Sequence, residues 1–196
     1  MTKIVLGVDE AGVGCMAGDM FVSAVALKEG TKLPGVKDSK KLTSTKREEL
    51  VDSIFETALW HCTIEASPAE IDQKGLWVMW SRLVVTLVKV GLRRFPDARV
   101  ILDGCRVPYE LQINRAVTAY PKADQNYLAV SAASNLAKHC QEACMEAYNR
   151  RYPLFGFSAH KGYCTSDHLA RVKEHGTCPI HRKSYKPIKN LLTSSV

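Results

Sequence analysis

Short apolar runs alternate along this chain with longer segments in which apolar residues recur at helical spacing, and this alternation constrains the fold most. Apolar runs of about four to eight residues are typical of buried strands. Apolar residues at every third or fourth position predict helices that bury one face. Together they predict an α/β fold in which helices cover a sheet. The expected strands are residues 3–8, 20–27, 60–66, 99–103 and 115–119, and the expected helices are residues 45–59, 75–94, 126–150 and 166–175.

Local signals mark the ends of several of these helices. Thr45 and Glu48 have the spacing of a capping box. Ser67 and Glu70 repeat that spacing and predict a further helix that starts after residue 67. Gly176 follows the segment 166–175 and is typical of the C′ position that ends a helix.

Length and composition limit the class of protein. The chain has 196 residues, of which 46% are hydrophobic and 24% are charged, so it can bury a sizeable core and is not disordered. We expect one domain over residues 1–196, with about 152–196 forming a C-terminal helical segment packed on it. The most apolar stretch, residues 76–92, is interrupted by polar residues, so no membrane span is expected. With no signal-peptide pattern at the start, a cytoplasmic protein is expected.

The cysteines bear on metal binding, and the charge distribution bears on the class of binding partner. Seven cysteines without paired metal-ligand spacing predict free thiols and disfavour zinc. Lys and Arg total 27 against 20 acidic residues, and residues 138–196 hold ten of these cations against four acids. Such a basic segment fits a polyanion partner, most simply nucleic acid. Charge alone leaves a merely soluble basic surface equally open.

Acidic residues follow two of the predicted strands. Asp9 and Glu10 come after an apolar run and precede glycine-rich residues 12–14, while Asp103 ends the run 99–103 and precedes Gly104. Each site alone is better explained as a turn, but two on neighbouring strands favour a metal-binding carboxylate cluster. Adjacent strand residues point to opposite faces, so Asp9 and Glu10 share a site only where the strand ends or bulges.

Carboxylate oxygens are hard ligands, which suit Mg²⁺ or Mn²⁺. Combined with a basic surface, they predict two-metal hydrolysis of a phosphodiester. The glycine-rich residues match neither a Walker loop nor a dinucleotide fingerprint, and their exposed backbone groups can approach a sugar–phosphate closely.

Several motifs in order along the chain resemble the signature of the type 2 ribonucleases H, the ribonuclease HII family. Any one of them is weak, but they run from residue 4 to about 192 in family order and are together highly specific. The matching residues are Gly7-Val-Asp9-Glu10-Ala-Gly12-x-Gly14-x-x-Ala17-Gly18, Asp38-Ser39-Lys40-Lys41-Leu42, Leu102-Asp103-Gly104, Lys122-x-Asp124, Ser131-Ala-Ala-Ser134, Tyr152-Pro153-x-Phe155-Gly156, His160-Lys161-Gly162-Tyr163 and His181-Arg182.

The resemblance implies a ribonuclease H-like fold, a mixed five-stranded sheet flanked by helices with a helical C-terminal appendage. It implies four metal-binding carboxylates, which match Asp9, Glu10, Asp103 and Asp124, with two Mg²⁺ or Mn²⁺ ions when substrate is bound. The spacing around Asp124 by itself fits a helix N-cap equally well. The other implied substrate contacts are a loop whose backbone senses the ribose 2′-OH (Gly12, Val13, Gly14), a tyrosine that stacks on the sugar (Tyr163), and a segment along the nucleic-acid backbone (Asp38, Ser39, Lys40).

The sequence departs from the family pattern near these contacts. Val13 stands where the family has Arg, Cys15 where it usually has Pro, and Ala123 where it has Gly. Gln141 and Glu142 replace an Arg-Asp pair. Because all four carboxylates are present, we expect hydrolysis to be intact. We expect substrate binding and specificity for RNA–DNA junctions to be altered.

Several other conspicuous residues have simpler interpretations. His160 and His181 could act as bases, but a two-metal site needs none, so phosphate contact or packing is preferred. Lys161 is expected to bind phosphate. Trp77 and Trp80 lie on the apolar helix 75–94, so we expect both to pack in the core rather than to stack on bases.

The resemblance therefore implies a monomeric endoribonuclease that hydrolyses the RNA strand of RNA–DNA hybrids and ribonucleotides embedded in duplex DNA, leaving 5′-phosphate ends. One alternative is a non-catalytic protein that binds hybrids or duplexes, which the basic C-terminal segment would suit. Another is a nuclease restricted to long hybrids.

Overall fold

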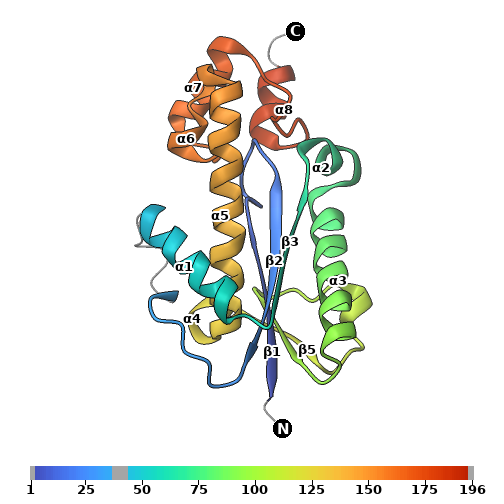
Figure 1. Cartoon of the computed structure of the whole chain (residues 1–196). Helices are drawn as coiled ribbons and strands as arrows, with labels where there is room; N and C mark the ends of the chain where they lie inside the picture. Colours follow the sequence, from blue (N-terminus) through green and yellow to red (C-terminus); the bar gives the residue numbers. More distant parts are fainter. Residues whose placement is uncertain (1–2, 37–43, 194–196) are drawn as a thin grey trace.

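Five strands form a single mixed sheet in the order β3-β2-β1-β4-β5 in a computed structural model of the chain, which describes residues 3–36 and 44–193 (Figure 1). Pairs β1–β2 and β2–β3 are antiparallel, whereas β1–β4 and β4–β5 are parallel. The strands are β1 Ile4–Ala11, β2 Met20–Lys28, β3 Trp60–Ala66, β4 Arg99–Asp103 and β5 Val117–Tyr120.

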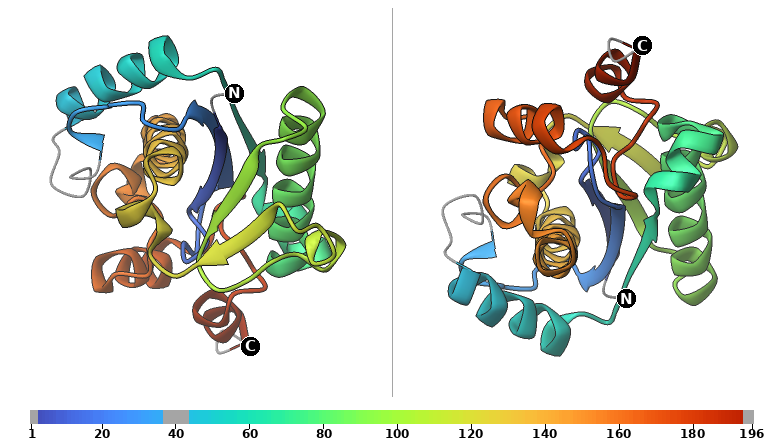
Figure 2. Two further views of the ribbon diagram at one scale, coloured as in Figure 1. Left: turned by 90° about the horizontal axis from the view of Figure 1, so that it is seen from below. Right: turned by 90° about the horizontal axis from the view of Figure 1, so that it is seen from above.

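Helices cover both faces of this sheet (Figure 2). Helix α3 lies on one face, α5 and α1 lie on the other, and α6, α7 and α8 gather at the end of the molecule that carries the C-terminus (Figure 1). The helices are α1 Ser44–Thr57, α2 Pro68–Lys74, α3 Leu76–Arg94, α4 Ala123–Asn126, α5 Leu128–Arg151, α6 Phe157–His160, α7 Ser166–His175 and α8 Lys186–Thr193. The predicted mixed sheet with flanking helices and a helical C-terminal part is confirmed.

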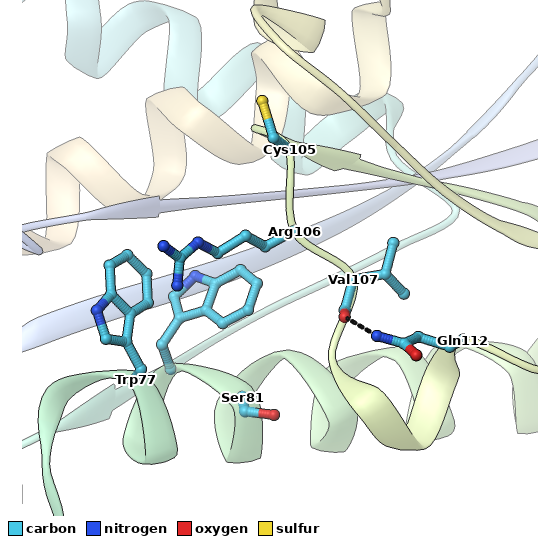
Figure 3. Close-up of a pocket in the computed structure, with 7 residues that line it drawn as sticks. Trp77, Ser81, Cys105, Arg106, Val107 and Gln112 are labelled. Carbon is cyan, nitrogen blue, oxygen red and sulfur yellow. Dashed lines mark hydrogen bonds between the residues drawn. The ribbon is translucent and has the colours of Figure 1, made fainter.

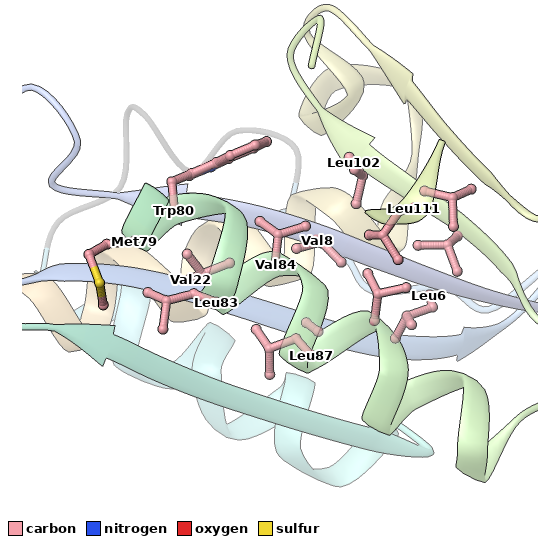
Figure 4. Packing of buried hydrophobic residues seen from close by; sticks show 14 of the residues in the cluster. Leu6, Val8, Val22, Met79, Trp80, Leu83, Val84, Leu87, Leu102 and Leu111 are labelled. Carbon is pink, nitrogen blue, oxygen red and sulfur yellow. The ribbon is translucent and has the colours of Figure 1, made fainter. Parts of the chain in front are cut away.

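The main core lies between α3 and the sheet (Figure 4). Strand side chains alternate between faces, so the even-numbered residues Leu6 and Val8 of β1 point toward α3. They meet Leu83, Val84 and Leu87, which lie on one face of that helix. Glu10 has the same parity as Leu6 and Val8, which places it on this side of the sheet.

On the other face, α5 touches the backbone of β1. A Cβ at Gly7 would overlap backbone atoms of Ala129 and Val130. The first turns of α5 are rich in small residues, and Ala132 and Ala133 are fully buried. This close approach needs glycine at position 7. Asp9 has the same parity as Gly7 and therefore faces α5.

Several predicted boundaries were wrong. Strand β1 does not end at residue 8 but runs to Ala11, because its pairing with β2 continues to Ala11–Phe21. The predicted helix 126–150 is α5, which begins two residues later at Leu128 because Tyr127 has extended backbone angles and separates it from the short helix α4. Segment 166–175 is not the last helix, because α8 follows it. Helix α1 stops at Thr57 and β5 is shifted to Val117–Tyr120.

Other predicted ends are correct. Strands β3 and β4 have the predicted bounds, and Ser67 and Glu70 form both hydrogen bonds of the capping box that starts α2. The side chain of Thr45 lies outside the described residues. Of the helices described here, no single one is long and apolar enough to cross a membrane, although α2 and α3, bent by 112°, reach that length and composition as a pair.

Replacing Gly7 by alanine should destabilise the protein strongly. The added methyl group has no space between β1 and α5, and its neighbours are backbone atoms that cannot rotate away. We expect the free energy of unfolding in urea to fall by about 3 kcal/mol or more. Gly30→Ala is the control, because a Cβ there meets no atom within 4 Å. Its loss of stability comes only from the positive φ of 86° and should be about 1–2 kcal/mol. Equal losses in the two variants would contradict the close-contact interpretation.

Candidate active site

Asp9 is buried between β1 and α5. Its Oδ1 accepts a 2.8 Å hydrogen bond from the backbone N–H of Glu10, and its carboxyl group also hydrogen-bonds to Ser134 on α5. Lys138 Nζ donates a 2.9 Å hydrogen bond to Ser134 Oγ, so Ser134 links this cation to Asp9. Burial, together with the nearby charges of Glu10 and Asp103, raises the pKa of Asp9 to about 7.

Glu10 occupies the opposite face of β1. Trp80 of α3 donates from its indole Nε1 to Glu10 Oε2 at 3.2 Å, which holds the carboxylate beside the core helix. Burial raises the pKa of Glu10, and the charge of Asp103 raises it further. Strand β1 runs one residue past Glu10, to Ala11, and near this end the charges of Asp9 and Glu10 both interact with that of Asp103 although the two side chains lie on opposite faces.

Asp103 lies at the end of β4, next to β1. The parallel pairing of these strands stops at Val8 and Leu102, so Asp9 and Asp103 take the next position on each strand. Asp103 Oδ1 accepts a 2.6 Å hydrogen bond from the backbone N–H of Ala123, the first residue of α4. Asp103 thereby fixes the start of α4.

Asp124 is the second residue of α4, directly after the residue that binds Asp103. The N-cap of α4 is Lys122, in a left-handed conformation with φ 57°, and that of α5 is Tyr127. The alternative in which Asp124 caps a helix is therefore wrong. Its proximity to Asp103 comes from the tertiary contact at Ala123.

These four side chains offer carboxylate oxygens alone. Across residues 3–36 and 44–193, no three acidic, His or Cys side chains are close enough together to form a complete metal site. Burial and, to a smaller extent, repulsion between the acids raise the pKa of Asp9 and Glu10, and a bound cation would relieve that repulsion. The donor set fits hard divalent ions such as Mg²⁺ or Mn²⁺.

The glycine-rich loop after β1 is held by the C-terminal part of the chain. Gly12 has φ 82°, and a Cβ there would come within 2.7 Å of Asp19 O. The carbonyl oxygen of Val13 accepts from Tyr185 Oη at 2.6 Å and from Arg182 Nη1 at 3.1 Å. The side chain of Val13 is half-buried against the main core.

Tyr163 lies beside this loop. Its ring is 3.8 Å from the Cβ position of Gly14, and 46% of the residue is exposed. Lys161 Nζ forms a 2.7 Å ion pair with Glu146, so part of its charge is already balanced. Gly12, Val13, Gly14 and Tyr163 thus form one surface next to the end of β1.

The two histidines are packed in the C-terminal part, in agreement with the packing interpretation. His181 is 1% exposed, and its Nε2 lies 3.1 Å from Nε2 of His168. His160 stacks on His168 with 4.0 Å between ring centroids. Asp38, Ser39 and Lys40 lie outside the described residues.

The prediction for the tryptophans is half wrong. Trp80 is buried and contacts Glu10, but Trp77 is 48% exposed although both lie on the apolar side of α3. Helical spacing predicted the apolar face, yet it carries no information on where the loop after β4 leaves that face open. Trp80 and Arg182 were also missed as parts of the site, since neither residue type signals a contact with an acid or a loop.

Comparison with known proteins identifies the chain's relatives. Residues 6–188 match the family model "Ribonuclease HII". Ribonuclease HII of Acidovorax sp. is 39% identical over 193 residues, which cover 98% of this chain and 90% of that protein. Ribonuclease HII of Thiobacillus denitrificans is 41% identical over 186 residues, covering 95% of this chain and 89% of that protein.

Solved structures are similar over nearly the whole chain. The ribonuclease HII in a complex with PCNA from Archaeoglobus fulgidus superposes with a TM-score of 0.77 at 28% identity and covers 95% of each chain. Ribonuclease H2 from Pyrococcus horikoshii superposes with a TM-score of 0.73 at 25% identity, covering 97% of this chain and 98% of that one. The fold is therefore ribonuclease H-like.

Asp9→Asn should stabilise the metal-free protein. The folded-state pKa of Asp9 is raised, so folded protein keeps a proton that the unfolded chain releases above about pH 4. Stability from this group falls as pH rises from about 4 to 7. We expect the melting temperature of Asp9→Asn in EDTA to exceed that of wild type by about 5–10 °C at pH 8 and by less at pH 5.

Addition of Mg²⁺ should raise the melting temperature of wild type more than that of Asp9→Asn, because the cation offsets the charge of the carboxylate. Identical melting temperatures at pH 8 in EDTA would contradict the assigned burial and repulsion at Asp9.

Proposed function

Because this chain belongs to the ribonuclease HII family, we propose that Asp9, Glu10, Asp103 and Asp124 form the catalytic centre of its endoribonuclease activity. The enzyme cleaves RNA in RNA–DNA hybrids and ribonucleotides embedded in duplex DNA. The observation that carries the assignment is that Asp9, Glu10 and Asp103 interact electrostatically at the ends of paired strands, with Asp124 tied beside them through Ala123.

Hydrolysis in this family depends on metal, and in this proposal the four carboxylates hold two Mg²⁺ or Mn²⁺ ions when substrate is bound. When bound, such ions lower the pKa of water and stabilise charge on the leaving oxygen. The protein's own contribution is to fix the carboxylates. Trp80 Nε1 orients Glu10, Ser134 orients Asp9, and the Ala123 N–H orients Asp103.

Substrate recognition in this proposal uses the surface around Gly12, Val13 and Gly14. Exposed backbone groups there can meet a ribose 2′-OH, the group that distinguishes RNA from DNA. Tyr163 lies against Gly14 and is half-exposed, which suits a ring that stacks on the neighbouring sugar. Asp38, Ser39 and Lys40 complete the proposed contacts on the nucleic-acid backbone, and Lys161 adds a cation near phosphate.

A protein that only bound hybrids would have no use for such a site. Clustered carboxylates repel phosphate, and the raised pKa values of Asp9 and Glu10, caused first by burial, indicate that these two cost folding free energy. Retention of all four therefore favours catalysis over the non-catalytic alternative.

The proposal includes a cytosolic monomer, and all seven cysteines are free thiols, as in a reducing compartment.

Asp103→Asn tests the catalytic centre. We expect the Mg²⁺-dependent cleavage of a labelled RNA–DNA hybrid to fall by about 100-fold or more, since a charged metal ligand is lost. Binding of the same hybrid in EDTA should persist or tighten, because repulsion of phosphate decreases. Asp97→Asn is the matched control, an exposed aspartate at the opposite end of β4, and should retain wild-type activity. Full activity of Asp103→Asn, or wild-type activity in EDTA, would overturn the assignment.

Val13→Arg tests the loop. Valine cannot donate to a phosphate, whereas arginine can do so with a charged, bidentate group. Wild type should cut a single embedded ribonucleotide more slowly than a long hybrid. We expect Val13→Arg to raise the cleavage rate at the single ribonucleotide, relative to that of the long hybrid, by about three- to tenfold. The salt dependence of binding should steepen by about one phosphate contact.

Val13→Gln is the control for this variant, because it is polar and carries no charge. Melting temperatures of both variants should be compared, since Val13 is half-buried. If wild type already cuts both substrates equally and Val13→Arg changes neither rate, the loop does not limit cleavage at single ribonucleotides.

A further inference from the structure

A cavity of about 450 Å³ opens between the first turns of α3 and the loop that follows β4 (Figure 3). Its walls include Trp77 and Trp80 from the helix and Cys105 and Arg106 from the loop. The loop begins directly after Asp103, and Trp80 also donates a hydrogen bond to Glu10. The cavity therefore neighbours the proposed catalytic centre through Trp80 and the loop after Asp103, although no carboxylate of the described residues lines it.

Arg106 is stacked on Trp77. Its guanidinium carbon lies 4.2 Å from the centroid of the indole ring, and the edge of Trp77 in turn meets Trp80 with 6.0 Å between ring centroids. Within the part of the chain that the structure describes, the guanidinium has no hydrogen-bond acceptor and no acidic partner. Both Arg106 and Trp77 are exposed to solvent.

Resting on the function proposed above, we propose that Trp77 and Arg106 form a binding subsite for a backbone phosphate of the nucleic-acid substrate. A stacked guanidinium keeps its N–H donors in one plane and directed away from the ring, which suits the two oxygens of a phosphodiester. The substrate supplies a continuous row of phosphates next to the scissile bond, and Trp80 in the wall of the cavity contacts Glu10 of the proposed catalytic centre.

A structural role alone does not account for this arrangement. The loop after β4 is already held by a hydrogen bond from Gln112 Nε2 to Val107 O and by the 3₁₀ helix Tyr109–Leu111. Trp77 keeps an exposed aromatic face that a core residue would bury. What the stack does provide is a long cationic side chain whose position is fixed before substrate arrives, which lowers the entropy cost of binding.

The test measures binding of an RNA–DNA hybrid by fluorescence anisotropy in EDTA over a series of salt concentrations, so that chemistry and metal do not contribute. Arg106→Gln should weaken binding about five- to tenfold and reduce the slope of log affinity against log salt by about one. Arg94→Gln is the matched control. Arg94 lies at the end of α3 far from Trp77, about 26 Å away by helix rise, and also sits over an aromatic ring, Phe95.

Trp77→Leu keeps apolar volume but removes the aromatic face. It should weaken binding about two- to fivefold, and the double variant Trp77→Leu/Arg106→Gln should bind no more weakly than Arg106→Gln alone, since the two side chains act as one unit. Arg106→Lys should retain the salt slope and still lose affinity, because an ammonium group does not form the stacked, bidentate group. Melting temperatures of all variants should stay close to that of wild type.

An unchanged salt slope in Arg106→Gln, or an equal loss in Arg94→Gln, would overturn this subsite. So would a loss from Trp77→Leu that persists undiminished when Arg106 is absent, since Trp77 would then act by itself. Cleavage of the hybrid by wild type is measured separately with Mg²⁺. If wild type cleaves and Arg106→Gln binds normally, the subsite alone is wrong, whereas absence of cleavage by wild type contradicts the proposed function.

Discussion

The backbone contact between β1 and α5 at Gly7 determines where the acidic residues can lie. A side chain at position 7 would push α5 away, and with it Ser134, the α5 partner of Asp9. The same helix continues from α4, whose first backbone N–H is bound by Asp103. One close approach of helix to strand therefore sets the surroundings of Asp9 and links α5, through α4, to Asp103 and Asp124.

A second constraint ties the C-terminal part of the chain to the glycine-rich loop. The guanidinium of Arg182 is fully buried and donates to the carbonyl oxygens of Gly18 and Val13 and to Tyr185 Oη. A buried charge is tolerated only when its hydrogen bonds are made, so the loop and the C-terminal segment stabilise one another. Gln141 adds a neutral link, because its amide donates to Lys161 O and to Cys15 Sγ. This explains how an amide at position 141 and a thiol at position 15 fit together where the family has other residues.

The sequence was informative wherever a property is local. Alternation of apolar runs predicted the sheet, capping residues predicted the start of α2, and the position of acids after strands made Asp9, Glu10 and Asp103 candidates for the site. Asp124 could not be found in this way, because its place depends on a hydrogen bond between residues 20 positions apart, Asp103 and Ala123. Trp77 was misjudged for the same reason, since only the path of the loop after β4 leaves its ring exposed. The resemblance to a known family supplied Asp124, whereas the residue pattern alone left it open.

The hydrogen-bond donors to Asp9, Glu10 and Asp103 are neutral, and this affects cation binding. Trp80 N–H, Ser134 O–H and Ala123 N–H orient three carboxylates without neutralising them. Direct ion pairs with Lys or Arg would lower the pKa of these acids and occupy the oxygens that a metal needs. Lys138 bonds to Ser134, the residue that hydrogen-bonds to Asp9. When Asp9 is ionised, the folded protein therefore carries a negative charge that these neutral partners do not compensate, and a bound cation would offset its cost in stability.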